Sequence, residues 1–191
     1  MKKVFLLGDS IRMGYDEYVR EMLKDQAEVY YTEENNRFAG HTHIGIPGWK
    51  MLSGEPEKVT VVHWNNGHWD CAHFNRDSEP YSTVAEYAGW LRRVYGCIRK
   101  HFPNAQVIFA TTTGIDQARY AQMSNPRSNE EIAEYNRAAV DVMAELGVPV
   151  NDLTAVAAEF PVEDFRDEVH FTEEGSRKLA EKVAEKIREY L

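Results

Sequence analysis

The stretch VFLLGDSIRMGY, residues 4–15, places a strand-like run directly before a helical pattern. Its first four residues, Val4–Leu7, are apolar, which is typical of a buried parallel strand and too short to cross a membrane. Further apolar residues recur with the spacing of one helix face, at Tyr15, Val19, Met22 and Leu23. Ser10 is therefore expected at a strand-to-helix turn, on the sheet edge where α/β proteins bind ligands. The alternative is that Asp9 or Ser10 only caps the helix.

The rest of the chain repeats this alternation of strand and helix. Strand-like runs occur at Val4–Leu7, Val29–Tyr31, Val59–Trp64, Val107–Thr111 and Val148–Val150. Helical stripes of apolar residues begin near Tyr15, at Val84, after Ser128 and near Leu179. The segment GIPGW, residues 45–49, is interpreted as a turn that leads into a short helix. The alternation predicts an α/β fold: a flavodoxin-like, three-layer α/β/α sandwich with about five parallel strands, as a single domain over residues 1–191.

Charge, cysteine and histidine content indicate which partners, compartment and metals to expect. The net charge of −9 argues against nucleic acid or an anionic membrane as the main partner. The two cysteines, Cys71 and Cys97, lack metal-site spacing and are expected to be free thiols in a reducing compartment. The first apolar run is interrupted by Gly8 and Asp9, too early for a secretory signal, so a cytoplasmic location is expected. No spacing among the seven histidines fits metal ligation, and no metal is expected.

A second motif stands near the other end of the chain. In FRDEVHFTEEG, residues 165–175, Asp167 and His170 are separated by two residues. A serine hydroxyl becomes a nucleophile when a general base lies within hydrogen-bond reach, and a carboxylate orients that base. A tight turn brings Asp and His together from positions i and i+3. The alternative is a surface histidine before a helix that Thr172 caps.

The sequence GDSI, residues 8–11, together with this Asp-x-x-His resembles the SGNH hydrolase (GDSL esterase/lipase) superfamily over the whole chain. Within it the chain looks like the intracellular members that act as carbohydrate acetylesterases. The resemblance implies that Ser10 is the nucleophile, His170 the base and Asp167 the carboxylate that orients it. It also implies that no cofactor is required.

Two further blocks of the superfamily concern the oxyanion hole. In NNRFAGHT, residues 35–42, the superfamily's Asn, second Gly and Thr are kept at Asn35, Gly40 and Thr42, whereas its first Gly is replaced by Arg37. The resemblance implies that the backbone N–H of Gly40 and that of Ser10 both donate to the oxyanion.

The third block departs from the superfamily pattern, Gly-x-Asn-Asp. In HWNNGHWD, residues 63–70, Trp69 occupies the position of the Asn whose side chain is the third donor. Asn65 shares strand parity with residues 67 and 69, so we expect Asn65 to be the replacement donor. Asn66 is the second choice, and the indole N–H of Trp69 is the remaining alternative.

The resemblance implies a serine esterase that hydrolyses short-chain (acetyl) esters through an acyl-enzyme. Aromatic and polar residues in the carboxyl-edge loops suit a sugar better than an alkyl chain, so the expected partner is a small acetylated sugar. One alternative is a short-chain thioesterase or lysophospholipase. The other is a non-catalytic, flavodoxin-like binding module. Nothing in the sequence indicates a particular oligomeric state.

Overall fold

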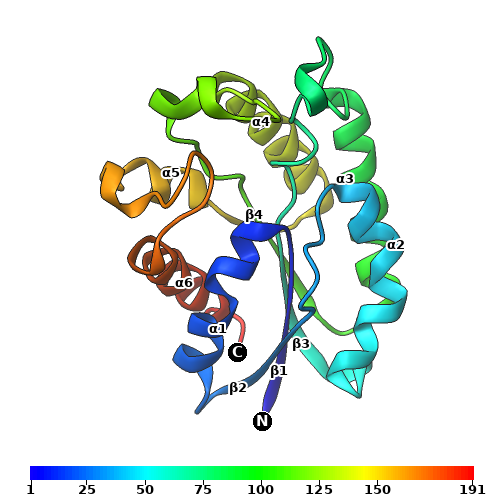
Figure 1. Ribbon diagram of the computed structural model, residues 1–191. Helices are drawn as coiled ribbons and strands as arrows, with labels where there is room; N and C mark the ends of the chain where they lie inside the picture. Colours follow the sequence, from blue (N-terminus) through cyan, green and yellow to red (C-terminus); the bar gives the residue numbers. More distant parts are fainter.

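Five parallel strands form one sheet in the computed structural model of the chain, which describes residues 1–191 (Figure 1). In chain order the strands are β1 (Lys2–Leu7), β2 (Ala27–Tyr31), β3 (Val59–Trp64), β4 (Gln106–Ala110) and β5 (Val150–Asn151). Their order across the sheet is β2-β1-β3-β4-β5. The predicted α/β sandwich with five parallel strands is confirmed.

Helices cover both faces of this sheet. Those on one face are α1 (Ser10–Leu23) and α6 (Glu173–Arg188), which pack against each other. The opposite face carries α2 (Ala39–Trp49), α3 (Val84–His101) and α4 (Asn129–Leu146). In Figure 1, α2 and α3 lie to the right of the strands, and α1 and α6 lie to their left. A short helix, α5 (Leu153–Ala158), packs beside α6.

The sequence explains why these elements form where they do. Val4, Phe5, Leu6 and Leu7 of β1 are all fully buried, because a central parallel strand is covered on both faces. The helices α3 and α4 both begin at capping boxes, with Thr83 and Ser128 as the N-cap residues. Together the strands and helices enclose one core of 44 buried apolar residues.

The prediction of a turn at residues 45–49 is wrong, because this segment forms the second half of α2. Glycine and proline normally interrupt helices, which is why the sequence pattern suggests a turn. Pro47 has no N–H for the carbonyl of His43, one turn earlier. The thiol of Cys97, on α3, donates to that carbonyl instead, with a sulfur–oxygen distance of 3.7 Å. Tertiary packing of α2 on α3 thus compensates for the missing backbone bond.

The order of the strands creates a crevice at the carboxyl edge between β1 and β3. The chain leaves β1 toward β2 on one side and returns past β1 to β3 on the other. Ligands of open α/β sheets bind at such a switch point. Gly8 follows β1 here, and a Cβ on this residue would lie only 1.9 Å from Oδ1 of Asn65, which follows β3. The glycine is therefore required for the close approach of the two strand ends.

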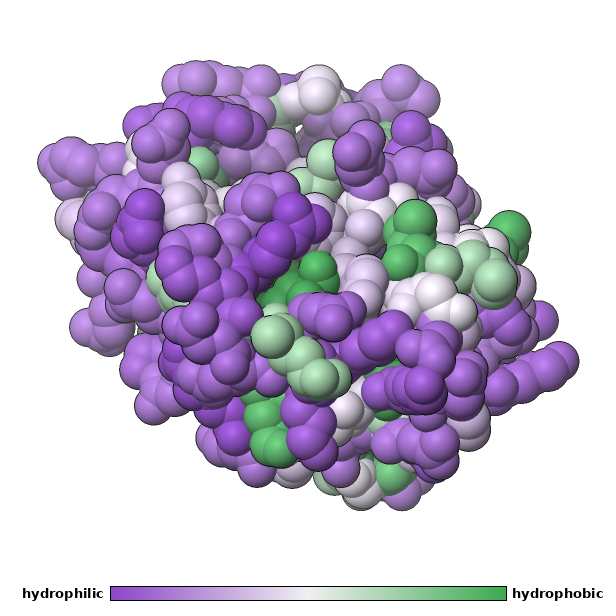
Figure 2. All heavy atoms as spheres, turned by 90° about the horizontal axis from the view of Figure 1, so that it is seen from below, coloured by the Kyte–Doolittle hydropathy of each residue, from purple (hydrophilic) through white to green (hydrophobic).

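The surface at the opposite end of the molecule is mainly hydrophilic. In Figure 2, which shows this end from below, apolar side chains form small, separated patches. None of the helices combines the length and the apolar composition that crossing a bilayer requires.

A buried charged group ties α1 to the segment after β2. The side chain of Arg12 is fully buried and donates to Asp16 Oδ2 at 2.6 Å. It also donates to the carbonyl oxygens of Thr32 and Glu34, at 2.7 and 2.6 Å. The guanidinium thereby supplies hydrogen-bond donors to carbonyl groups of an irregular loop, where burial keeps water away.

We expect Arg12→Met to lower the free energy of unfolding by about 3–5 kcal/mol, because it leaves the Asp16 carboxylate and two carbonyls buried without a partner. Urea unfolding at neutral pH measures the change. Arg20→Met is the matched control on the same helix, since Arg20 is exposed and pairs with Glu17, a contact worth at most about 1 kcal/mol. Equal losses in the two variants would show that the buried network does not stabilise the fold.

Candidate active site

Ser10 is the first residue of α1 and lies directly after the carboxyl end of β1. Asp9 is the N-cap residue, and its carboxylate accepts from the N–H of Ile11 at 3.0 Å. The capping role therefore belongs to Asp9, which leaves the hydroxyl of Ser10 free to face the pocket at the sheet edge. The backbone N–H of Ser10, in the first turn of the helix, has no intrahelical partner.

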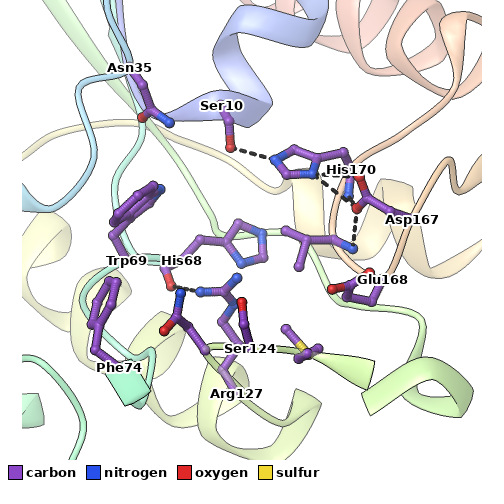
Figure 3. A pocket seen from close by; sticks show the side chains of 13 residues that line it. Ser10, Asn35, His68, Trp69, Phe74, Ser124, Arg127, Asp167, Glu168 and His170 are labelled. Carbon is purple, nitrogen blue, oxygen red and sulfur yellow. Dashed lines mark hydrogen bonds and ion pairs between the residues drawn. The ribbon is translucent and has the colours of Figure 1, made fainter. Parts of the chain in front are cut away.

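The structure brings Ser10, His170 and Asp167 together (Figure 3). Nε2 of His170 lies 2.8 Å from the Ser10 hydroxyl oxygen, although 160 positions separate the two residues. Nδ1 of the same ring lies 3.0 and 2.9 Å from the two carboxylate oxygens of Asp167. One imidazole thus connects a hydroxyl on one side with a carboxylate on the other.

The environment of Asp167 keeps this carboxylate ionised. Partial burial raises the pKa of Asp167, but the backbone N–H groups of His170 and Val169 and the His170 ring together hold the pKa below its ordinary value. The N–H of His170 donates to Oδ1 at 2.7 Å, and that of Val169 at 2.9 Å. These bonds also fix the carboxylate on the side of Nδ1, where it orients the ring.

The loop that carries Asp167 and His170 is attached at several points. Its ends are joined by a β-bridge between Phe165 and Phe171. The N–H of Asp116 donates to the Glu168 carbonyl at 3.0 Å, which connects the loop to the segment after β4. At Gly175, in the first turn of α6, a Cβ would lie 2.7 Å from the carbonyl oxygen of Asp164. A residue without a side chain therefore lets α6 approach the base of the loop.

The hydroxyl of Ser10 opens into a pocket of about 330 Å³. One side carries aromatic rings: those of Trp69 and Phe74 lie 5.6 Å apart and are inclined by 35°. Only four of the 13 lining residues are hydrophobic. The lining residues are Ser10, Asn35, His68, Trp69, Phe74, Met123, Ser124, Asn125, Arg127, Asp167, Glu168, Val169 and His170.

Asn65 does not line this pocket, contrary to the expectation from strand parity. Its Nδ2 donates to the Asp9 carboxylate at 2.9 Å, and its Oδ1 accepts from the hydroxyl of Tyr15 at 3.4 Å. Asn66 does not line it either: Oδ1 accepts from the Trp64 indole and Nδ2 donates to the Arg37 carbonyl. The prediction assumed that the alternation of side chains along a strand continues beyond residue 64. Strand β3 ends at Trp64, so this alternation does not extend to the pocket.

Gly40 is buried at the second position of α2 and also lies outside the residues that line the pocket. Its backbone N–H has no hydrogen-bond partner within the chain, as expected in the first turn of a helix. The N–H of Ala39, just before it, donates to both carboxylate oxygens of Asp70, at 3.1 and 3.2 Å.

Asn35 is a pocket residue to which the sequence assigned no role. Its Oδ1 accepts from the N–H of Arg37 at 2.8 Å, and its Nδ2 has no partner. Figure 3 shows the side-chain amide above the pocket, with its nitrogen toward Ser10. The match of Asn35 to the second superfamily block was the available signal. Arg127 was missed as well, because no motif contains it. His68 lies within the third block, HWNNGHWD, but the pattern assigned it no catalytic role.

No group of three or more His, Cys, Asp or Glu side chains is placed so that it could hold a metal ion. Cys71 and Cys97 are not joined in a disulfide.

A serine at the carboxyl edge of a parallel sheet, bonded to a histidine that a carboxylate orients, is the arrangement of a serine hydrolase. The chain belongs to the GDSL-like Lipase/Acylhydrolase family, whose sequence model matches residues 6–178. It is thus a serine hydrolase of the GDSL/SGNH type. A search among curated protein sequences gave no match.

Solved structures share the fold over nearly the whole chain. The acetyl xylan esterase AlAXEase is 20% identical, with a TM-score of 0.74 over 97% of this chain and 99% of that one. A lipase/acylhydrolase from Enterococcus faecalis is 22% identical, with a TM-score of 0.78 over 99% and 96%. A carbohydrate acetylesterase family member from Sinorhizobium meliloti is 17% identical, with a TM-score of 0.75 over 100% and 99%.

Asp70 follows the pocket residue Trp69 in the chain and is fully buried. Burial, with a smaller contribution from the nearby Asp9, raises the pKa of Asp70 to about 8, although the hydrogen bond from the Ala39 N–H lowers it. In the unfolded chain an aspartate has a pKa of about 3.9. Between about pH 4 and pH 8 the unfolded state therefore releases a proton that the native state keeps, so this group destabilises the fold increasingly as the pH rises.

We expect Asp70→Asn to remove this pH dependence. The amide keeps an acceptor for the Ala39 N–H but does not ionise. The free energy of unfolding of the variant, relative to the wild type, should therefore rise between pH 4 and pH 8, whatever its value at pH 4. Urea unfolding at pH 4, 6 and 8 measures it, with Asp77→Asn, an exposed change in the same connection between β3 and α3, as the control. Parallel curves for wild type and Asp70→Asn would show that Asp70 is ionised in the native state.

Proposed function

We propose that this hydrolase is an esterase that removes short acyl groups, acetyl above all, from small carbohydrate esters by means of Ser10, His170 and Asp167. The observation that carries the proposal is the bonding of one His170 ring to the Ser10 hydroxyl at 2.8 Å and to Asp167 at 2.9 Å. A binding module has no need of a hydroxyl, a base and a carboxylate in this order.

In the first half of the reaction, Oγ of Ser10 attacks the carbonyl carbon of the ester while Nε2 of His170 takes the hydroxyl proton. Asp167 stabilises the imidazolium that forms. The tetrahedral intermediate then collapses: the bond between carbon and the leaving oxygen breaks, and His170 returns the proton to the departing alcohol. Ser10 is left as an acyl ester.

In the second half, water takes the place of the alcohol. His170 accepts a proton from the water as its oxygen attacks the acyl carbon. When the second tetrahedral intermediate collapses, the proton passes to Oγ of Ser10 and the carboxylic acid leaves. The same ring thus acts as base and acid in turn, and no cofactor takes part.

The negative oxygen of each intermediate needs donors that are in place before it forms. We assign this role to the N–H groups of Ser10 and Gly40, both without partners in the chain, and to Nδ2 of Asn35. Asn35 fits the role of the side-chain donor better than Asn65, because the Asn65 amide already donates to the Asp9 carboxylate. The bond from the Arg37 N–H to Asn35 Oδ1 holds the free nitrogen in one orientation.

The pocket favours a short acyl group. Its volume of about 330 Å³ is near the lower end of small-molecule sites, and only four hydrophobic residues line it. Each methylene of a longer chain stabilises a complex by about 0.8 kcal/mol only where apolar surface receives it. A lysophospholipase would need such a surface. The more apolar cavity nearby, about 520 Å³ and lined by Ile115 and Phe160 among others, does not contain Ser10.

Two observations support a sugar as the alcohol part. The inclined rings of Trp69 and Phe74 offer the flat apolar surface on which the C–H face of a sugar packs, beside amides and hydroxyls for its oxygens. The structural relatives include an acetyl xylan esterase and a carbohydrate acetylesterase family member. The free cysteines Cys71 and Cys97 support a reducing compartment, and we propose the cytoplasm.

We expect the wild type to hydrolyse p-nitrophenyl acetate, with kcat/KM falling steeply from acetate to octanoate because longer chains find no apolar channel. Ser10→Ala should hydrolyse neither ester above background while it keeps the circular dichroism spectrum and the unfolding midpoint of the wild type. A fluorophosphonate probe should label the wild type at Ser10 and leave the variant unlabelled.

Two kinds of outcome would contradict these expectations. Undiminished turnover by Ser10→Ala, or labelling at another residue, would disprove the nucleophile. Preference for octanoate, or for an acyl-CoA over acetylated sugars, would favour the thioesterase or lysophospholipase.

For the oxyanion hole, we expect Asn35→Ala to lower kcat about 100-fold with little change in KM, because the donor acts on charge that develops only in the transition state. Steady-state kinetics with p-nitrophenyl acetate measures both constants. Trp69→Phe is the matched test of the other free N–H on this side of the pocket, since it keeps an aromatic ring. A larger loss in Trp69→Phe than in Asn35→Ala would assign the side-chain role to the indole.

A further inference from the structure

Arg127 carries a positive charge into the pocket that also contains Ser10. Its Nη1 donates to the carbonyl oxygen of His68 at 2.6 Å, and its Nε is buried without a partner. No Asp or Glu side chain forms an ion pair with this guanidinium. Figure 3 shows it beside His68 and Ser124, on the side of the pocket away from Ser10.

This arrangement is energetically unfavourable for the free protein. Burial lowers the pKa of Arg127, whereas the more distant Cys71, Asp9 and Glu168 raise it through space. A guanidinium nevertheless remains charged at every relevant pH, and buried charges are normally paired. Arg12, which is fully buried, contacts a carboxylate at 2.6 Å. Arg127 differs from it in lacking a negative partner.

A purely structural role does not explain this charge. The single bond to the His68 carbonyl requires one N–H donor, which an uncharged amide side chain supplies without the desolvation of an ion. His68 itself contributes no charge to the pocket, because burial holds its pKa well below the ordinary value. The remaining Nη donors of the guanidinium make no hydrogen bond within the protein and are available to an anion that enters the pocket.

We propose that Arg127 binds a carboxylate on the alcohol part of the substrate, so that the ester is an O-acetylated sugar acid. The inference rests on the proposed esterase function and narrows its substrate class. Because Arg127 and Ser10 line one pocket of about 330 Å³, the carboxylate and the ester belong to the same small molecule. The acidic group and the scissile ester would occupy opposite sides of the sugar ring, which packs on Trp69 and Phe74.

The charges of the pocket favour a carboxylate over a phosphate. Asp167 and Glu168 line the same pocket and repel a second negative charge. One guanidinium balances one monoanion, whereas a sugar phosphate carries nearly two charges at neutral pH. Arginine also matches the planar geometry of a carboxylate.

The test compares esters that differ only at C6 of the sugar. The substrates are the mono-O-acetyl isomers of methyl glucoside, of the corresponding methyl glucuronoside and of the glucoside 6-phosphate. We expect the wild type to hydrolyse the best glucuronoside isomer with a kcat/KM about 10-fold or more above its glucoside counterpart, as a charge-assisted hydrogen bond allows. The 6-phosphate should not exceed the glucuronoside. A phosphate preference, or equal rates for glucuronoside and glucoside, would overturn the proposal.

Variants test whether Arg127 is responsible for the preference for the glucuronoside. Arg127→Gln should bring the ratio of kcat/KM for the glucuronoside to that for the glucoside to about one, and each kcat/KM is compared within the variant, so that a general loss of turnover does not affect the ratio. Arg127→Lys should retain part of the ratio. Arg137→Gln is the control, since Arg137 lies exposed on α4 and makes no hydrogen bond. An unchanged ratio in Arg127→Gln would contradict the proposal.

A measurement on the wild type covers the case in which Arg127→Gln does not fold. Free glucuronate should inhibit hydrolysis of p-nitrophenyl acetate competitively, at concentrations where glucose does not, and added salt should weaken the inhibition. Equal inhibition by the two sugars would overturn the proposal. Failure of the esterase function itself would appear differently, as the absence of Ser10-dependent turnover of any acetate.

Discussion

The buried carboxylate of Asp9 holds together the part of the molecule on which the site depends. It accepts from the N–H of Ile11 at 3.0 Å and from Nδ2 of Asn65 at 2.9 Å. The first bond begins α1, and the second joins the end of β1 to the end of β3. Gly8 permits this contact because a side chain there would collide with Asn65. Ser10 is therefore held on a rigid junction of two strands and a helix, with its hydroxyl outward.

The second half of the site depends on packing between the two ends of the chain. Helix α6 packs against α1 on the same face of the sheet, and the loop before α6 carries Asp167 and His170. Gly175 lets the helix approach the loop, and the Phe165–Phe171 bridge closes it. The bond between His170 and Ser10 is thus a result of how two helices pack. A small change in that packing would alter the distance on which proton transfer depends.

The pocket combines two electrostatic environments. Around His170, a carboxylate fixed by backbone donors stabilises positive charge on the imidazole. Farther from Ser10, the guanidinium of Arg127 has no negative partner. The first environment supports acyl transfer on any ester that reaches Ser10. We propose that the second selects, among the alcohols to which the acyl group is attached, those that carry a carboxylate.

The sequence by itself determined the sheet and the principal helices, and its motifs singled out Ser10, Asp167 and His170 as candidates. Buried strands, amphipathic helices and short motifs depend on neighbouring residues, so they can be read locally. Tertiary structure alone decided that 45–49 is helical, because the donor to the His43 carbonyl comes from α3. It also decided that Asn65 supports Asp9, that Asn35 faces Ser10, and that Arg127 enters the pocket unpaired. Those outcomes depend on contacts between segments far apart in the chain, which spacing along the sequence does not encode.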